Sequence, residues 1–299
     1  MQDLVTAEWS DAVEAIERCY ELGWTDGLPV VPPTLERVNQ FLDFAGRSPD
    51  EVLGEIPERR REITVAKAAS NAVMAGCLPE YFPVVLAATE AMLAPEFNLI
   101  APSSSQGGAA VLVIVNGPVV EELGINSKNN LFGPGNRANA TIGRAIRLIL
   151  MNACASIPGL FDRTVIGHPG KYTFCIAENE TDSDWLPLHV ERGLCADQSA
   201  VTVFAAWEPR QVRSASHSQE VVLDTVADVA SVLGSSLASS DSVGDESLPV
   251  RQGQVVVTIA GSADFWGDWT KRGGREYLRP RIGRSIAALE IVRGLGGHV

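Results

Sequence analysis

Residues 109–115 read Ala-Ala-Val-Leu-Val-Ile-Val, and this apolar run decides the expected fold class. A strand without polar residues on either face is typical of the centre of a sheet that is covered on both sides. The sequence predicts further strands at 97–101, 171–177, 200–206 and 254–260. Since helices and strands intermix without strict alternation, we expect an α/β or α+β fold, with a mixed sheet, helices on its faces and a helical N-terminal segment.

The expected helices are marked by caps and by apolar residues at helical spacing. Thr34 is a suitable N-cap, and Gly46 a suitable end, for a helix that carries Val38 and Phe41. Ser48-Pro-Asp-Glu51 predicts the start of a short third helix, because Pro is favoured at the first position and acidic residues follow it. Further helices are predicted between Ser10 and Gly23 and at 65–76, 79–93, 118–123, 137–154, 218–234 and 281–294.

Changes in composition along the chain predict four regions. Residues 231–253 are rich in Ser, Gly and Asp and offer little to bury, so we expect a flexible linker there. After it the charge changes sign, because residues 271–299 hold seven Lys or Arg and two Glu. This basic stretch is either a solvated helix face or a surface that docks on acidic groups. The predicted regions are a helical N-terminal segment (1–60), a main α/β core (61–230), the Ser-rich linker (231–253), and a C-terminal strand and basic helix packed on the core (254–299).

The composition argues against several classes of protein. The 299 residues include 24 Lys or Arg and 37 Asp or Glu, which gives a net charge of −13. Such an acidic chain repels phosphate backbones, so we expect no nucleic-acid partner. No apolar stretch approaches the ~18–20 residues that a membrane span needs, and the N-terminus lacks the basic and apolar parts of a signal peptide. Five cysteines without a Cys-x-x-Cys pair indicate free thiols, so we expect a cytoplasmic protein.

The strongest local motif is Phe132-Gly-Pro-Gly-Asn-Arg-Ala-Asn-Ala-Thr-Ile-Gly-Arg-Ala145. It predicts a turn through Gly135, a cap at Asn136 and a helix with Arg137 in its first turn. A cation there opposes the helix dipole, and an anionic ligand held by free N–H groups and the guanidinium would remove the conflict. The alternative is that Arg137 pairs with a carboxylate of the chain. The residues predicted to bind a small anionic substrate are Gly135, Asn136, Arg137, Asn139, Thr141, Arg144 and Lys67.

Two of the four histidines are expected in turns, where they are available for chemistry. His168 precedes the strand predicted at 171–177, and His189 follows it by a short loop. Histidine titrates near neutrality and acts as general acid or base when a carboxylate such as Glu178 orients its ring. A second possibility is that both histidines bind a divalent metal together with Glu178 and Glu180, although their spacing matches no specific metal motif. A hydrogen-bonded structural role is the third.

Cys77 is the cysteine with the most suggestive position. It ends a predicted helix and lies just before Pro79, which begins the next one. A thiol that approaches a helix N-terminus has a lowered pKa, and Lys67 would add positive potential, so Cys77 is a candidate catalytic thiolate. The alternative is an inert packing residue, which is what most single cysteines in apolar helices are.

Five segments together resemble an uncharacterised bacterial family, whose members accompany proteins with a selenocysteine- or cysteine-Gly-Ser-Cys motif. The resemblance covers roughly residues 20–206. It implies an enzyme system with a reactive thiol or selenol on a partner chain, and it assigns no catalytic residue. The segments that carry it are Trp24-Thr-Asp-Gly-Leu-Pro-Val-Val-Pro-Pro-Thr34, Asn71-Ala-Val-Met-Ala-Gly-Cys77, Gly133-Pro-Gly-Asn-Arg-Ala-Asn-Ala-Thr-Ile-Gly-Arg144, Gly167-His-Pro-Gly-Lys-Tyr172 and Leu188-His-Val-Glu-Arg-Gly193.

These features predict an enzyme, or the substrate-binding subunit of one, that acts on a small anionic metabolite. The chemistry is expected to be acid–base, as in a lyase or hydratase, or a thiol-dependent reduction. The alternative is a non-catalytic partner that docks and positions a thiol or selenol protein. No nucleotide or flavin motif is present, so the cofactor is left open, with a divalent metal as one possibility. Assembly is expected either with the Sec/Cys-Gly-Ser-Cys protein or between copies of this chain.

Overall fold

The computed structural model describes residues 12–182, 185–213, 218–238, 253–259 and 286–293. The chain divides into two compact units, and each is described by itself. Unit 1 comprises Met1–Asn126, Phe132–Ala177 and Leu194–Glu208. Unit 2 comprises Ser127–Leu131, Glu178–Gly193 and Pro209–Val299. Helices and strands are mixed in sequence, and the expected α+β class is confirmed.

The central strand predicted from the apolar run is confirmed. β3 (Ala110–Asn116) is buried along its whole length and lies in the middle of a three-stranded sheet of unit 1. β5 (Ala200–Ala206) pairs with it antiparallel and β4 (Cys175–Ala177) pairs with it parallel, so the sheet is mixed. The strand predicted at 171–177 is shorter than expected, because η4 (Pro169–Lys171) forms a 3-10 turn before it.

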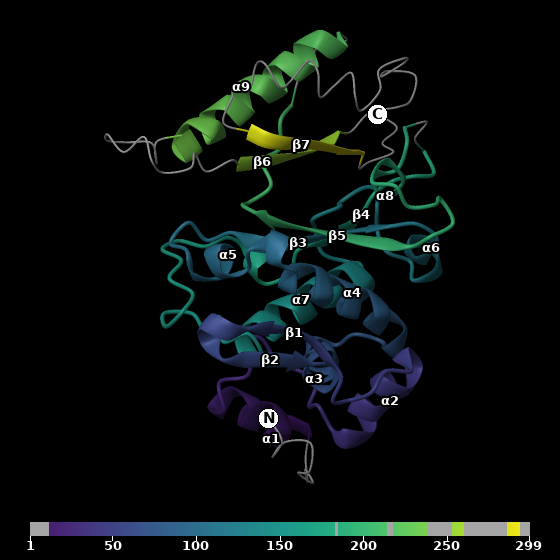
Figure 1. Ribbon diagram of the computed structural model, residues 1–299, viewed down its shortest axis with the longest axis vertical. Coiled ribbons are helices and arrows are strands. Elements are labelled where there is room, and N and C mark those ends of the chain that lie inside the picture. Colours follow the sequence, from purple (N-terminus) through teal and green to yellow (C-terminus); the bar gives the residue numbers. More distant parts are fainter. Residues whose placement is uncertain (1–11, 183–184, 214–217, 239–252, 260–285, 294–299) are drawn as a thin grey trace. The chain divides into compact units, whose positions relative to one another are not determined.

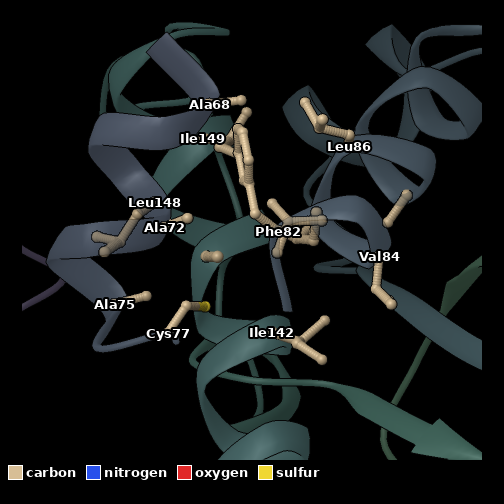
Figure 2. Packing of buried hydrophobic residues seen from close by; sticks show 14 of the residues in the cluster. Ala68, Ala72, Ala75, Cys77, Phe82, Val84, Leu86, Ile142, Leu148 and Ile149 are labelled. Carbon is tan, nitrogen blue, oxygen red and sulfur yellow. The ribbon is translucent and has the colours of Figure 1, made fainter. Parts of the chain in front are cut away.

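Three helices form much of the apolar core of unit 1 (Figure 1). These are α3 (Val65–Ala75), α4 (Phe82–Leu93) and α7 (Arg137–Asn152), and all three were predicted. η2 (Pro79–Tyr81) leads directly into α4. Figure 2 shows apolar side chains of the three helices meeting around Phe82, which is fully buried. Burial of one such aromatic side chain stabilises the fold by about 1.5–3 kcal/mol.

The N-terminal helices end where their caps predict. α2 (Leu35–Ala45) begins after Thr34, whose side chain accepts a hydrogen bond from the amide of Arg37. It ends at Gly46, which has a φ of 62° and therefore needs a residue that tolerates the left-handed region. α1 (Ala12–Glu21) is present as well, and its predicted cap, Ser10, lies outside the described residues.

The prediction of a third helix after Ser48 is wrong. The chain makes a turn there and continues as β1 (Val52–Ile56), which η1 (Pro57–Arg59) joins to its antiparallel partner β2 (Arg61–Thr64). Gly54 disfavours a helix here, and it allows β1 to lie close to α4, because a Cβ in its place would lie 2.9 Å from the Cβ of Leu93. The Pro and acidic residues that were interpreted as a helix start suit a turn equally well.

The prediction of a strand at 97–101 is also wrong. η3 (Pro95–Phe97) is a 3-10 turn, and α5 (Ile100–Ser104) is a short helix. Asn98 lies between them with a φ of 51°, a conformation that Asn tolerates but that interrupts any strand. The helix predicted at 118–123 is confirmed as α6 (Val119–Glu122).

The described part of unit 2 contains two further helices and two parallel strands. α8 (Leu188–Glu191) is one turn long, and α9 (Gln219–Ala238) extends past the predicted end at 234 into the Ser-rich stretch. β6 (Gly253–Ile259) was predicted, but β7 (Ile286–Arg293) replaces the helix expected at 281–294. β7 pairs with β6 through several β-branched residues, and this pairing overrides helix propensity. The expected linker from 239 to 252 and the basic stretch outside β7 lie outside the described residues.

Helix α7 approaches the sheet most closely at Gly143. A Cβ at this position would lie 2.5 Å from the amide nitrogen of Phe174 and would clash with Oγ1 of Thr173. The same threonine hydroxyl donates a hydrogen bond of 2.8 Å to the carbonyl oxygen of Ala140, one turn earlier on α7. Because the opposing atoms include backbone, the contact leaves no room for a side chain.

We therefore expect Gly143→Ala to lower the free energy of unfolding by about 1–3 kcal/mol through overpacking. This loss should appear although Ala is the better helix former by about 1 kcal/mol. The matched control is Ala140→Gly at an exposed position of the same helix. Its free energy of unfolding should fall only by that difference in helix propensity, about 1 kcal/mol. Urea unfolding followed by circular dichroism measures both, and a Gly143→Ala variant at least as stable as wild type would contradict the close contact.

Candidate functional site

The polar residues predicted to form an anion site at the start of α7 make contacts within the chain itself. Arg137 donates from Nε and Nη2 to the carbonyl oxygen of Gly76, at 3.2 and 3.0 Å. Gly76 ends α3, where the helix dipole is negative, so this contact resolves the conflict between Arg137 and its own helix. Asn136 caps α7 by accepting from the amide of Asn139 at 3.0 Å. Gly135 is exposed and has a φ of 119°, which explains the glycine.

The other polar residues predicted on α7 also have partners within the chain. Asn139 accepts from the amide of Asn126 at 2.7 Å and donates to the carbonyl oxygens of Asn126 and Cys175. Thr141 donates to the carbonyl oxygen of Arg137 at 2.8 Å. These bonds hold α7 against the start of β4 and against the loop at Asn126, so they explain the residues without a ligand.

Arg144 holds the proline-rich segment that follows α1. Its Nε and Nη2 both bond the carboxylate of Asp26 at 2.8 Å, and Nη2 also donates to the carbonyl oxygens of Leu28 and Pro29. Only 3% of the Asp26 side chain is exposed. Two parallel bonds from a guanidinium to a buried carboxylate are among the stronger polar contacts in proteins. Lys67, also predicted to bind substrate, donates from Nζ to the carbonyl oxygen of Glu62 at 2.5 Å.

The prediction that Cys77 has a lowered pKa is wrong. Its thiol lies among apolar side chains of α3 and α7 (Figure 2), and burial raises its pKa to about 12. A hydrogen bond with Thr141 and the charge of Arg137 lower the pKa, but by less than burial raises it. The positive charge of Lys67 acts on Cys154 instead.

His189 belongs to unit 2 and is almost fully buried on α8. Neither ring nitrogen has a hydrogen-bond partner among the residues that the structure describes, and Nδ1 lies 3.7 Å from Oε1 of Glu180. Glu178 is also buried, and its Oε2 accepts a hydrogen bond of 2.7 Å from the amide of Leu188. Within the described ranges, no three or more His, Cys, Asp or Glu side chains are arranged to hold a metal ion. The metal interpretation of His168, His189, Glu178 and Glu180 therefore finds no support there.

The structure brings together a polar cluster in unit 1 that the sequence interpretation missed. Asp162 has 2% of its side chain exposed and pairs with both Arg147 and Lys171, at 3.2 and 2.9 Å. Thr164 donates to the same carboxylate from its hydroxyl at 2.5 Å and accepts from Nζ of Lys171 at 2.7 Å. Burial raises the pKa of Asp162, but the bonds from Thr164 and Lys171 outweigh it and leave the pKa below its ordinary value.

A small cavity lies beside this cluster. Its volume is about 20 Å³, room for about one water molecule, and Arg147, Asp162 and Lys171 line it together with Ser103. Arg59 adds a third cation next to it by donating from Nη2 to Oγ of Ser103 at 2.8 Å. Two cations and one carboxylate thus line this cavity, with Arg59 beside it, in a chain whose net charge is −13. This cavity and its charged residues are the candidate site.

His168 lies next to the candidate site along the chain. It caps η4, and its Nδ1 accepts from the amide of Gly170 at 3.2 Å. Its Nε2 is buried without a well-formed hydrogen bond, although the backbone of Ala206 is close enough to raise its pKa. Burial is the larger effect, opposed by the charge of Glu208 and reinforced by that of Lys171, so the pKa of His168 is lowered.

The sequence patterns indicated only part of this site. Gly167-His-Pro-Gly-Lys-Tyr172 was singled out for its histidine, and Lys171 stands in the same motif. Nothing in the sequence links Arg147 to Asp162, because their ion pair is a tertiary contact between α7 and the segment that follows this helix.

Comparison of the chain with models of known families, with curated proteins and with solved structures gave no match. The functional argument therefore rests on the geometry and charge of the site. None of the helices in the described part of the chain is long and apolar enough to cross a membrane.

The buried thiols give a direct test. At neutral pH, iodoacetamide should label the exposed Cys195 first and Cys77 far more slowly. A pKa of about 12 leaves on the order of 10³-fold less thiolate than an ordinary thiol, and burial blocks access as well. Peptide mass mapping over a time course gives the order, and all five thiols should react at similar rates in guanidinium chloride. Labelling of Cys77 ahead of Cys195 would restore it as a reactive thiol.

The charged cluster gives a second test. Asp162→Asn leaves Arg147 and Lys171 facing each other without a carboxylate, so we expect a loss of about 3–5 kcal/mol of stability. Glu21→Gln, which removes the exposed pair with Arg18, should cost at most about 1 kcal/mol.

The difference in stability between wild type and Asp162→Asn should depend on pH. The pKa of Asp162 is lower in the folded than in the unfolded chain, so its contribution is complete above the unfolded value of about 3.9. It is lost as the pH falls from there through the folded value. Wild type should therefore lose more stability on acidification than Asp162→Asn, as measured by urea unfolding at several pH values. Equal losses would show that Asp162 is not ionised in the fold.

Proposed function

We propose that this chain is an enzyme, or the substrate-binding subunit of one, that transforms a small anionic metabolite by acid–base chemistry at the candidate site. The observation that carries the proposal is the local excess of positive charge around a cavity of an acidic protein. Arg147 and Lys171 share a single carboxylate, Asp162, and Arg59 lies beside them through its bond to Ser103. Such an excess favours an anionic ligand, which gains charge-assisted hydrogen bonds from the guanidinium and the ammonium.

Lys171 is the residue to which we assign proton transfer. Burial lowers its pKa, and so does the charge of Arg147, although the bond to Asp162 opposes both. A lysine with a lowered pKa has a larger neutral fraction, which is what a general base needs. His168 also has a lowered pKa but does not line the cavity, so it is the second candidate. Arg147 would hold the anion, because its planar donors match a carboxylate.

Acid–base chemistry of the lyase or hydratase type is a better fit than thiol-dependent reduction. The buried Cys77, Cys154 and Cys175 all have a raised pKa, which opposes formation of a thiolate. All five cysteines are free, as in proteins of a reducing compartment, and the cytoplasm is the setting we propose.

The second candidate function is a non-catalytic partner of another chain, and one observation favours it. The loop before His168 exposes several large apolar side chains, with Val165 and Ile166 exposed to 75% and 95%. Such side chains often mark contact surfaces. A Sec/Cys-Gly-Ser-Cys protein is the partner that the sequence resemblance implies, and a second copy of this chain is the other. Turnover by the isolated chain would favour the enzyme, and light scattering would give its assembly state.

The test of the enzyme uses proton exchange. Short hydroxy, unsaturated and oxo carboxylates are incubated with the protein in D2O, and loss of C–H signals is followed by NMR. We expect exchange with at least one class, and a rate that rises with pH as Lys171 loses its proton. Lys171→Met should lower the rate by about 10²–10⁴-fold.

The control is Arg163→Gln, which removes an exposed charge from the same loop and should leave the rate unchanged. His168→Gln tests the second candidate, since a larger loss there than in Lys171→Met would move the base to the histidine. Absence of exchange with every carboxylate would overturn the enzyme and leave the partner function.

A further inference from the structure

We infer that the cavity beside Asp162 binds a single halide ion, such as chloride. The inference rests on the same excess of positive charge as the proposed function, but it requires no turnover and names an occupant of the cavity itself. A volume of about 20 Å³ leaves room for one particle of the size of a water molecule. A halide ion is close to that size, whereas sulfate and gluconate are larger.

The charged side chains that line the cavity leave one positive charge uncancelled. Arg147 and Lys171 line it as cations, and Asp162 is the only acidic side chain among the described residues that do so. Each of the two cations has only 12% of its side chain exposed, so water screens their charges poorly. An unbalanced charge is costly in such surroundings, and one monovalent anion would balance it.

The carboxylate of Asp162 has no lone pair left for another donor. Its Oδ1 accepts from the amide and the hydroxyl of Thr164, at 3.2 and 2.5 Å. Its Oδ2 accepts from Arg147 and Lys171, at 3.2 and 2.9 Å. These contacts use all four acceptor sites of a carboxylate. Any further donor of the two cations therefore needs an acceptor other than Asp162.

Both cations have such further donors. A guanidinium has five N–H groups, and Arg147 uses one of them toward the described residues, in the bond from Nη1 to Asp162. An ammonium has three, and Lys171 uses two, toward Oγ1 of Thr164 at 2.7 Å and toward Asp162. Because both side chains line the cavity, an occupant of the cavity can accept from them.

This surplus of donors favours a halide over a water molecule. A water molecule accepts hydrogen bonds but also has two of its own to donate, and the carboxylate beside it already has its full set. A halide only accepts, so it can bind N–H groups of both cations and needs no acceptor in return. At the start of α7 the situation is different, because a carbonyl oxygen of the chain already accepts from Arg137.

The first test locates the ion in the wild-type protein. Crystals of the whole chain are soaked in sodium bromide, and anomalous scattering at the bromine absorption edge distinguishes bromide from water. We expect an anomalous peak in the cavity, within hydrogen-bonding distance of Arg147 and Lys171. Density in the cavity without an anomalous signal would identify a water molecule and overturn the inference. This test does not depend on whether a variant folds.

The second test measures binding in solution. Chloride exchange with the protein broadens the chloride NMR signal, and titration with bromide should reverse the broadening. Arg147→Gln should weaken chloride binding about tenfold or more, the worth of one charge-assisted hydrogen bond. The matched control is Arg163→Gln, which removes an exposed charge from the same loop and should bind chloride like wild type. Equal affinity in Arg147→Gln and wild type would overturn the inference.

A third measurement uses the carboxylate. Asp162→Asn keeps both cations and removes the negative charge that repels an anion, so it should bind chloride more tightly than wild type. Replacement of sodium gluconate by sodium chloride at constant ionic strength should then raise the urea midpoint of Asp162→Asn more than that of wild type. An equal rise in both proteins would contradict a chloride ion next to Asp162.

Failure of the inference and failure of the proposed function are distinguishable. Bound bromide without proton exchange on any carboxylate would keep the halide site and remove the enzyme. Proton exchange without bound bromide would keep the enzyme and remove the halide site.

Discussion

The close contact of α7 with the backbone at Phe174 is the constraint on which the rest of unit 1 depends. Gly143 allows the helix to lie against the start of β4 with no side chain between them. The polar residues of α7 then reach three different places: Asn139 reaches the end of the loop before β4, Arg144 reaches Asp26, and Arg147 reaches the cavity. One helix therefore fixes the N-terminal segment, the sheet and the candidate site relative to one another within this unit. A shift of α7 would break all three connections together, since they share one rigid element.

The arginines of α7 differ in how the chain balances their positive charge. Arg137 and Arg144 are neutralised by the chain, through the negative end of α3 and through a bidentate carboxylate. Arg147 shares its carboxylate with Lys171, so the charge around Asp162 does not cancel. An uncancelled buried charge is costly, and proteins usually retain one where it serves binding or catalysis. The uncancelled charge thus lies at Arg147, further along the same helix than Arg137, where the sequence predicted an anion.

The sequence predicted the elements whose signals are local. The apolar run at 109–115 and the caps at Thr34 and Gly46 correspond directly to β3 and α2. Two kinds of element were predicted wrongly. The Pro and acidic residues after Ser48 suit a turn as well as a helix start, and the chain forms β1 there. In β7, hydrogen bonding to β6 determines the structure, and this pairing cannot be seen in the local sequence. The tertiary contacts of the predicted site residues could not be read from the sequence for the same reason. Arg137 conflicts with its own helix when only neighbours along the chain are considered, and the carbonyl that resolves the conflict lies 61 residues away. Asp162 and Arg147 meet only through tertiary packing.

Burial shifts the pKa of a thiol and of an amine in this chain in opposite directions. Removal from water always disfavours the charged form of a group. For Cys77 the charged form is the reactive one, so burial raises the pKa of the thiol and makes it inert. For Lys171 the neutral form is the reactive one, so burial lowers the pKa of the amine and makes it more nucleophilic. Arg137 helps Cys77 too weakly to reverse the first effect, whereas Arg147 reinforces the second. Burial and a neighbouring cation thus lower the pKa of the Lys171 amine together, whereas burial outweighs the neighbouring cation at the Cys77 thiol.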